Sequence, residues 1–248
     1  MRRHQLAQML IIGVIASLIG IAVALSINWF PVQGSIQSRK VDHLYDVLLV
    51  ASVPVFVLVE VVVLYSVWRF RMRPGEEDKD GPPIHGNTAL EIIWTAIPAL
   101  MIFGLVTYAY IVLVDIEKKP KGHEMTVEVT GQQFAWSYQY KEPGKPTVNT
   151  DVLYVPKGES VRFNIRATDV IHDFWVPAFR MKIDAVPGIT THYRITPARN
   201  GSYAVVCAEL CGLGHSTMRS TVIVVDRNTF RGWLAQKQAA KPAGVATT

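Results

Sequence analysis

The sequence predicts a membrane-anchored protein in which two or three N-terminal transmembrane helices precede an all-β domain. Three observations indicate this fold class. The chain is poor in charge: half of its 248 residues are hydrophobic and 18% are charged, against about 25% in a typical soluble domain. The apolar excess lies in the first 115 residues. Short alternating segments rich in β-branched and aromatic residues follow it.

Three apolar stretches are each long enough to form a transmembrane helix. They run over about 9–30, 47–68 and 92–114, and the second contains one charged residue, Glu60. About 20 helical residues cross the hydrocarbon layer, and lipid offers no partners to a backbone that is not helical. Because a carboxylate in mid-span is costly, we expect Glu60 to face protein or water.

The first stretch, within residues 1–40, permits two interpretations. Arg2 and Arg3 before an apolar run are typical of a signal peptide, and Ala-Val-Ala at 22–24 is a possible cleavage site. The apolar run continues past this site through Trp29 and Phe30, which favours a retained transmembrane helix. The other two stretches are predicted to form a helical hairpin over 41–115.

Basic residues predict the orientation of the helices. The loop between the second and third stretches contains Arg69, Arg71, Arg73 and Lys79, so the positive-inside rule places it in the cytoplasm. The segment after residue 115 then emerges on the outer side of a bacterial cell membrane. A net charge of +5 spread over an apolar chain fits a lipid-embedded protein, and we expect no nucleic-acid partner.

Residues 116–235 are predicted to form a β-sandwich or β-barrel. Turns containing glycine and proline separate the predicted strands, which cover 125–130, 134–140, 161–165, 191–196, 203–207 and 220–225. A helix is expected to begin at Asp226. Residues 236–248 are expected to be a disordered tail of small residues.

Soft metal donors gather directly after one predicted strand. Cys207, Cys211, His215 and Met218 have the spacing C-x3-C-x3-H-x2-M. Thiolate, imidazole and thioether ligands suit copper in electron-transfer sites. Three alternatives are a disulfide, which an oxidising compartment allows, a zinc site, for which methionine is a poor ligand, and a thiol-exchange pair, which lacks a thioredoxin-like pattern here. The whole motif favours copper, and a site with two metals would need a further histidine such as His172.

The chain resembles subunit II of the haem-copper cytochrome c oxidases over about residues 40–230. Residues 207–218 resemble the copper A loop of that family, and residues 170–172 and 182–188 resemble its upstream ligand segment. Residues 85–98 resemble the start of its second core helix. These segments occur in the order that the family has.

The resemblance implies a cupredoxin-like Greek-key β-barrel with a binuclear copper A centre. Cys207 and Cys211 would bridge two copper ions as thiolates. His172 and His215 would each supply an imidazole nitrogen. Met218 and the backbone carbonyl of Glu209 would be the two weak ligands. The Glu209 carboxylate would bind a magnesium ion shared with subunit I. Glu91 matches a carboxylate at the mouth of one proton channel.

The resemblance also implies the function and the partners. Subunit II of a terminal respiratory oxidase takes electrons from cytochrome c or a similar carrier on the outer side. It passes them to haem in subunit I, where O2 is reduced to water and protons are pumped; subunit III is a further partner. The chain contains no C-x-x-C-H motif, so we expect no haem c of its own.

Two features concern the electron donor. The family often has a tryptophan, the proposed point at which electrons enter, where this chain has Phe134, and Trp136 matches a second tryptophan that packs in the barrel. Residues 117–235 contain 15 Lys and Arg against 11 Asp and Glu, a net charge of +4. A basic cytochrome c would be steered by an acidic patch, so we expect a membrane-bound or a neutral-to-acidic donor.

Three other functions compete with this interpretation. A membrane-tethered copper chaperone would use the two cysteines and a distant histidine, but His215 and Met218 count against it. A quinol-oxidase subunit would lack the copper ligands. A nitrous oxide reductase has a similar loop without the helical hairpin.

Overall fold

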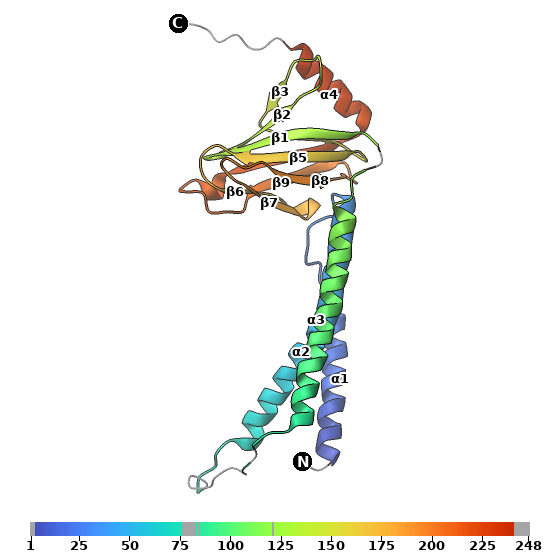
Figure 1. Ribbon diagram of the computed structural model, residues 1–248, viewed down its shortest axis with the longest axis vertical. Helices are drawn as coiled ribbons and strands as arrows, with labels where there is room; N and C mark the ends of the chain where they lie inside the picture. The colour runs from blue at the N-terminus through green and yellow to red at the C-terminus, as the bar shows by residue number, and fades with distance from the viewer. Residues whose placement is uncertain (1–2, 76–82, 84, 121, 241–248) are drawn as a thin grey trace. The chain divides into compact units, whose positions relative to one another are not determined.

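The computed structural model describes residues 3–75, 83, 85–120 and 122–240 (Figure 1). The chain divides into two compact units. One unit comprises Met1–Trp29 and His43–Leu113, and the other comprises Phe30–Asp42 and Val114–Thr248. The first unit is helical and the second is built from β-sheets, which confirms the predicted fold class.

Three helices in the described residues are long and apolar enough to cross a membrane. They are α1 (Arg3–Ser26), α2 (Ile36–Phe70) and α3 (Thr88–Ile116). α2 and α3 contain the second and third predicted apolar stretches, because a bilayer-length apolar run favours an intrasegment hydrogen-bond ladder. α1 contains most of the first stretch but ends at Ser26, before the predicted end at residue 30. Most of their side chains are exposed or half-buried in the isolated chain and few are buried, as is expected for surfaces that contact lipid or other membrane proteins. Arg2, used for the possible signal peptide, and Lys79, used for the predicted orientation, lie outside the described residues.

The β unit is a sandwich of two five-stranded sheets. One sheet has the strand order β3-β2-β1-β5-β8 and the other has β4-β10-β9-β6-β7, and Figure 1 shows them as stacked layers. The strands are β1 (Glu124–Gln132), β2 (Ala135–Tyr140), β3 (Val148–Thr150), β4 (Leu153–Pro156), β5 (Ser160–Ala167), β6 (His172–Val176), β7 (Met181–Ala185), β8 (Thr191–Ile195), β9 (Gly201–Cys207) and β10 (Arg219–Val225).

Most strand pairs are antiparallel, but two pairs are parallel. β1 pairs with β5 and β10 pairs with β4 in parallel register. Parallel neighbours require the chain to cross over before it pairs, and here the crossovers carry it from one sheet to the other. This topology brings β9 beside β6, with Cys207 opposite Phe174.

The core lies between the two sheets. Strand residues alternate between buried and more exposed positions, as in β1, where Val127 and Val129 are fully buried. Phe163 on β5 and Phe174 on β6 meet across the sheets with ring centroids 5.9 Å apart. These large buried side chains give the loops at the end of the sandwich a rigid support.

The helix α4 (Arg227–Ala239) covers one end of the sandwich, near β2 and β3 (Figure 1). It buries Phe230 and Leu234, and Trp233 stacks on Tyr154 with ring centroids 4.3 Å apart. The helix therefore includes residues 236–239, which were predicted to begin the disordered tail. Burial of the apolar face of the helix stabilises it as far as Ala239, although the small residues there had predicted disorder. Residues 241–248 of the predicted tail lie outside the described residues.

The segment Phe30–Asp42 is part of the β unit. Ser35 forms an isolated antiparallel bridge with Pro197, and Gly34 exchanges backbone hydrogen bonds with Ala178 and Ala198. Arg180 donates two side-chain hydrogen bonds to Asp42, of 2.6 and 2.8 Å. The sequence did not predict this attachment, because it depends on residues about 140 positions apart.

Candidate metal centre

The β1–β2, β5–β6 and β9–β10 loops meet at one end of the sandwich, and the predicted metal donors lie on or beside the last two. The β9–β10 loop supplies four of the predicted donor side chains and the Glu209 carbonyl, and it begins at Cys207, the last residue of β9. His172 is the first residue of β6, which pairs with β9. Gly212 has φ +132°, a conformation that side chains other than glycine rarely adopt. This turn lets the chain reverse and bring Met218 back toward Cys207, whose N–H donates to the Met218 carbonyl at 3.1 Å.

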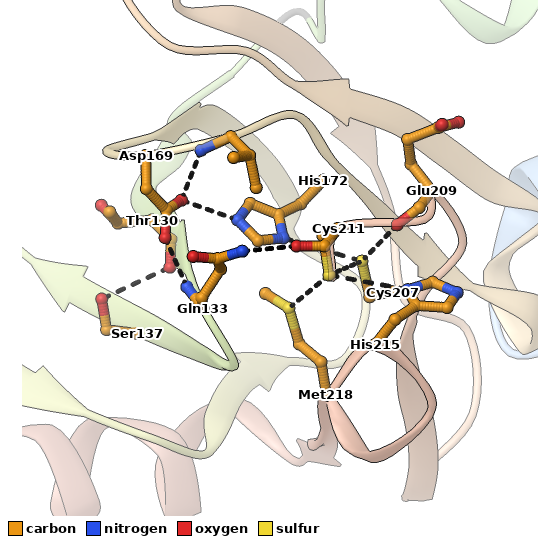
Figure 2. A network of polar contacts seen from close by, with 11 residues as sticks. Thr130, Gln133, Ser137, Asp169, His172, Cys207, Glu209, Cys211, His215 and Met218 are labelled. Atoms are coloured by element: carbon orange, nitrogen blue, oxygen red, sulfur yellow. Dashed lines mark hydrogen bonds and ion pairs between the residues drawn. The ribbon is translucent and has the colours of Figure 1, made fainter. Parts of the chain in front are cut away.

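The Sγ atoms of Cys207 and Cys211 lie side by side, and the other four predicted donors surround them, as Figure 2 shows. Cys207 Sγ lies 3.8 Å from Cys211 Sγ, 3.8 Å from His172 Nδ1 and 3.3 Å from the carbonyl oxygen of Glu209. Cys211 Sγ lies 3.6 Å from His215 Nδ1 and 3.8 Å from Met218 Sδ. Each thiol therefore has one imidazole nitrogen and one weak donor beside it.

The two cysteines are free thiols. A disulfide needs an S–S bond of about 2.05 Å, so their separation of 3.8 Å does not support that alternative. Burial, together with the hydrogen bond and charge of Cys207, raises the pKa of Cys211 to about 11. A metal that binds the thiolate form would displace that proton.

The donor set fits a soft metal. Metal–thiolate bonds are about 2.3 Å long in zinc sites, so one ion can bridge sulfurs up to about 4.6 Å apart. The observed 3.8 Å lies within this limit. Among the described residues, His172, Cys207 and Cys211 form the one group of His, Cys and carboxylate side chains close enough to hold a metal. Sulfur and imidazole donors of this kind suit copper.

Asp169 orients His172 toward the thiols. The His172 ring is fully buried, and its Nε2 lies 2.9 Å from Asp169 Oδ1 while its Nδ1 faces Cys207. A carboxylate on the outer nitrogen fixes the tautomer that leaves the inner nitrogen free to bind a metal. Burial opposes ionisation of Asp169, but hydrogen bonds from the Gln133 N–H, His172 and the Val170 N–H outweigh it and lower its pKa to about 2.

Gln133 connects the three loops. Its backbone N–H donates to Asp169 Oδ2 at 2.7 Å, and its side-chain amide donates to the carbonyl oxygen of Cys211 at 2.6 Å. Neither Gln133 nor Asp169 was predicted as a site residue. A carboxylate three positions before a predicted histidine ligand was an available signal for Asp169, whereas Gln133 could be found only from the fold.

The two aromatic residues predicted near the site occupy different environments. Phe134 is 38% exposed, and its ring lies against Gly214, where a Cβ would stand only 2.5 Å from the ring. Trp136 is 2% exposed and meets the His172 ring edge-on, with centroids 6.0 Å apart. The exposed ring thus covers the metal loop from outside, and the buried ring packs behind His172.

The carboxylates of the two acidic residues with predicted roles, Glu209 and Glu91, do not belong to the His172, Cys207 and Cys211 group. The Glu209 side chain points away from the two sulfurs while its carbonyl faces Cys207 (Figure 2). Glu91 lies in the first turn of α3. Its carboxylate accepts a hydrogen bond of 3.3 Å from the Asn87 N–H, and Asn87 Oδ1 accepts one of 3.1 Å from the Leu90 N–H. Glu91 therefore caps the start of α3.

Comparisons with known proteins agree on one family. Residues 146–227 match the family described as cytochrome c oxidase subunit II, periplasmic domain, and residues 22–112 match its transmembrane domain. Cytochrome c oxidase subunit 2 of Thermostichus vulcanus is 34% identical over 94% of this chain and 86% of the relative. The protein of the same name from Alkalihalophilus pseudofirmus is 38% identical over 79% of this chain and 58% of the relative. The periplasmic domain of subunit II of cytochrome oxidase from Bradyrhizobium japonicum is 32% identical over 48% of this chain and 95% of that structure, with a TM-score of 0.44.

Proposed function

The chain belongs to the cytochrome c oxidase subunit II family, and we propose that its β unit holds a binuclear copper A centre. As a member of this family it is one subunit of a haem-copper oxidase, a membrane protein with an extracellular domain. One observation carries the proposal. Two imidazole nitrogens, a thioether sulfur and a carbonyl oxygen each lie within 4 Å of one of two neighbouring free thiols. The relatives are oxidase subunits, so the alternative of a copper chaperone is not favoured.

We assign the ligand roles from this geometry and from the family. Cys207 and Cys211 would hold the copper ions as thiolates, and His172 and His215 would each supply Nδ1. Met218 and the Glu209 carbonyl would be the weak ligands, because a thioether sulfur and an amide oxygen bind copper less strongly than a thiolate or an imidazole. When bound, copper A supplies a one-electron redox centre. The donors lie on a loop and at strand ends supported by a stiff sheet, which would limit their movement between redox states.

The remaining parts of the oxidase function also belong to the proposal. Electrons arrive from cytochrome c or a similar carrier on the outer side of the bacterial cell membrane and leave to haem in subunit I, where O2 reduction is coupled to proton pumping. Subunits I and III are the membrane partners. The Glu209 carboxylate, which points away from the sulfurs, is available for a magnesium ion shared with subunit I. Glu91 stands at the mouth of a proton channel in addition to capping α3.

Electrons enter, in this proposal, through Phe134. Its ring is exposed and rests on Gly212 and Gly214 of the metal loop, whereas Trp136 is buried and packs on His172. Further exposed apolar side chains flank the site on the β5–β6 and β9–β10 loops: Val170, Ile171, Leu210 and Leu213. With a net charge of +4 over residues 117–235, this surface suits a membrane-bound or neutral-to-acidic donor. Fast turnover with a soluble basic cytochrome c that falls steeply with added salt would contradict this donor assignment.

Metal analysis tests the copper assignment. We expect two copper ions per chain in the purified protein. Cys211→Ser removes one of the two thiolates and should lower the copper content below two ions per chain. It should also abolish the electron paramagnetic resonance signal of a copper pair. Ser137→Ala, which removes a hydroxyl near the site that contacts no donor, serves as the matched control and should keep two. A single, loosely held Cu(I) in the wild-type protein would instead support a chaperone.

A further inference from the structure

The α2 helix carries a carboxylate deep in its apolar segment. Glu60 lies 8 residues before Trp68 and 13 residues after Val47, the bounds of the apolar stretch. At 1.5 Å per residue, this places its Cα roughly 12 Å along the helix from the nearer end. The Cα–Cβ bond of a helical residue tilts toward the helix N-terminus, so the Glu60 side chain leans toward the farther end. A carboxylate with so short a stem cannot reach the nearer headgroups from there.

Glu60 has no partner within the described part of this chain. No hydrogen bond or ion pair involves it, although its side chain is exposed on the helical unit. The hydroxyls of Ser17, Ser52, Thr95 and Thr107 on the three spans donate to carbonyls of their own helices instead. A carboxylate at this depth needs a hydrogen-bond partner from outside the chain, because an unpartnered one is costly in hydrocarbon.

The surface around Glu60 shows what kind of partner fits. Its neighbours one turn away, Phe56, Val63 and Leu64, are all exposed and apolar. Such a face would not line a water-filled channel, and it suits packing against another apolar helix. One hydrogen-bond donor on that helix would satisfy the carboxylate, as polar residues do between membrane helices.

We propose that Glu60 and its apolar neighbours form an interface with a transmembrane helix of another oxidase subunit, and that this helix carries a hydrogen-bond-donating side chain at the depth of Glu60. The chain's membership of an oxidase complex supplies the partner's class. The interface lies in the helical unit, so it is independent of the copper ligands in the β unit.

Variants of the complete oxidase test this interface. Glu60→Leu removes the acceptor and should lower the temperature at which this subunit dissociates, by roughly 5 °C for the loss of a membrane-embedded polar pair. Glu60→Gln keeps the shape and an acceptor oxygen and should show a smaller fall. Val62→Leu, an apolar change on the opposite side of α2, is the matched control and should show none. Copper content should stay at the wild-type value in all three.

If Glu60 faces lipid, Glu60→Leu removes a costly carboxylate from hydrocarbon, and the dissociation temperature stays the same or rises; this outcome overturns the interface. If Glu60→Leu prevents assembly, the wild-type oxidase decides, because a hydrophobic carbodiimide modifies carboxyl groups that are accessible from the bilayer. The peptide containing Glu60 should be modified only after the subunits are separated. Equal modification in the intact oxidase would sink the proposal.

Discussion

Asp169 determines which nitrogen of His172 faces the two thiols. Its carboxylate accepts from His172 Nε2 and from two backbone N–H groups, which fixes the buried ring in place. We predict that Asp169→Ala weakens copper binding about 10- to 100-fold, the usual effect of removing an outer partner of a histidine ligand. Competition with a copper chelator measures it. Asp151→Asn, a change at an exposed carboxylate, should leave the affinity unchanged, and an equal loss in both variants would refute the specific role of Asp169.

Gly214 allows the Phe134 ring to lie on the metal loop. Its backbone conformation, φ −91° and ψ 10°, is open to other residues, but a Cβ there would stand 2.5 Å from the ring. We predict that Gly214→Ala displaces the ring and slows electron uptake from the donor several-fold while copper content is kept. Stopped-flow reduction measures the rate. Gly232→Ala, where a Cβ meets nothing within 4 Å, is the control, and an unchanged rate in Gly214→Ala would argue against entry through Phe134.

The residues that meet at the candidate site could be predicted from the sequence, but the residues that support them could not. Residue type and spacing within one loop indicate a metal site at Cys207, Cys211, His215 and Met218. Gln133 acts only because the β1–β2 turn meets that loop in space, 78 positions away. Glu91 shows the converse, because the sequence suggested a role in proton uptake and the structure adds a helix cap.

At the scale of elements, most strands with alternating burial were predicted, whereas β3, β4, β6 and β7 were missed. β1 and β5 alternate along their length. β6, whose only exposed residue is Trp175, has no polar face to reveal its period, and β3 and β4 are too short to show one. The helix α1 is present as an apolar span, and its retention in the mature protein stays a prediction.

One ion pair joins strands of the same sheet and gives the β unit a pH-dependent term. Glu124 on β1 accepts from Arg194 on β8 and from Ser160 on β5, and the Arg194 hydrogen bond holds the pKa of Glu124 below its usual 4.5. Because the folded pKa is lowered, the pair stabilises the fold above about pH 4.5, and this contribution is lost as the pH falls through the lowered value.

We predict that Arg194→Leu lowers the unfolding free energy of the β unit by about 1 kcal/mol at pH 7 and by less near pH 3. Thermal unfolding at the two pH values measures this difference. Arg199→Leu, which changes an exposed arginine, is the control for charge alone. A deficit that is the same at both pH values would contradict the role given to Glu124.

At the scale of the whole molecule, the segment Phe30–Asp42, which includes the first residues of α2, belongs to the β unit. The Arg180 side chain is 6% exposed and that of Asp42 is 17% exposed, and Arg180 also donates to the carbonyls of Pro31 and Pro177. Breaking a buried pair leaves an uncompensated charge, which costs about 3–5 kcal/mol.

Arg180→Leu should therefore lower the unfolding temperature of the β unit markedly. Lys145→Leu, which breaks the exposed pair with Glu142, should cost under about 1 kcal/mol and is the matched control. Thermal unfolding of the full chain measures both. Equal effects of the two variants would show that the segment Phe30–Asp42 contributes little to the fold.

The central claim is that two coppers share the two thiolates of one loop. Electron paramagnetic resonance of the oxidised, copper-loaded protein tests it most directly. We predict a mixed-valence signal with hyperfine splitting from one unpaired electron shared equally between two copper nuclei, lost in Cys211→Ser. A signal from a single copper nucleus in the fully loaded protein would contradict the claim.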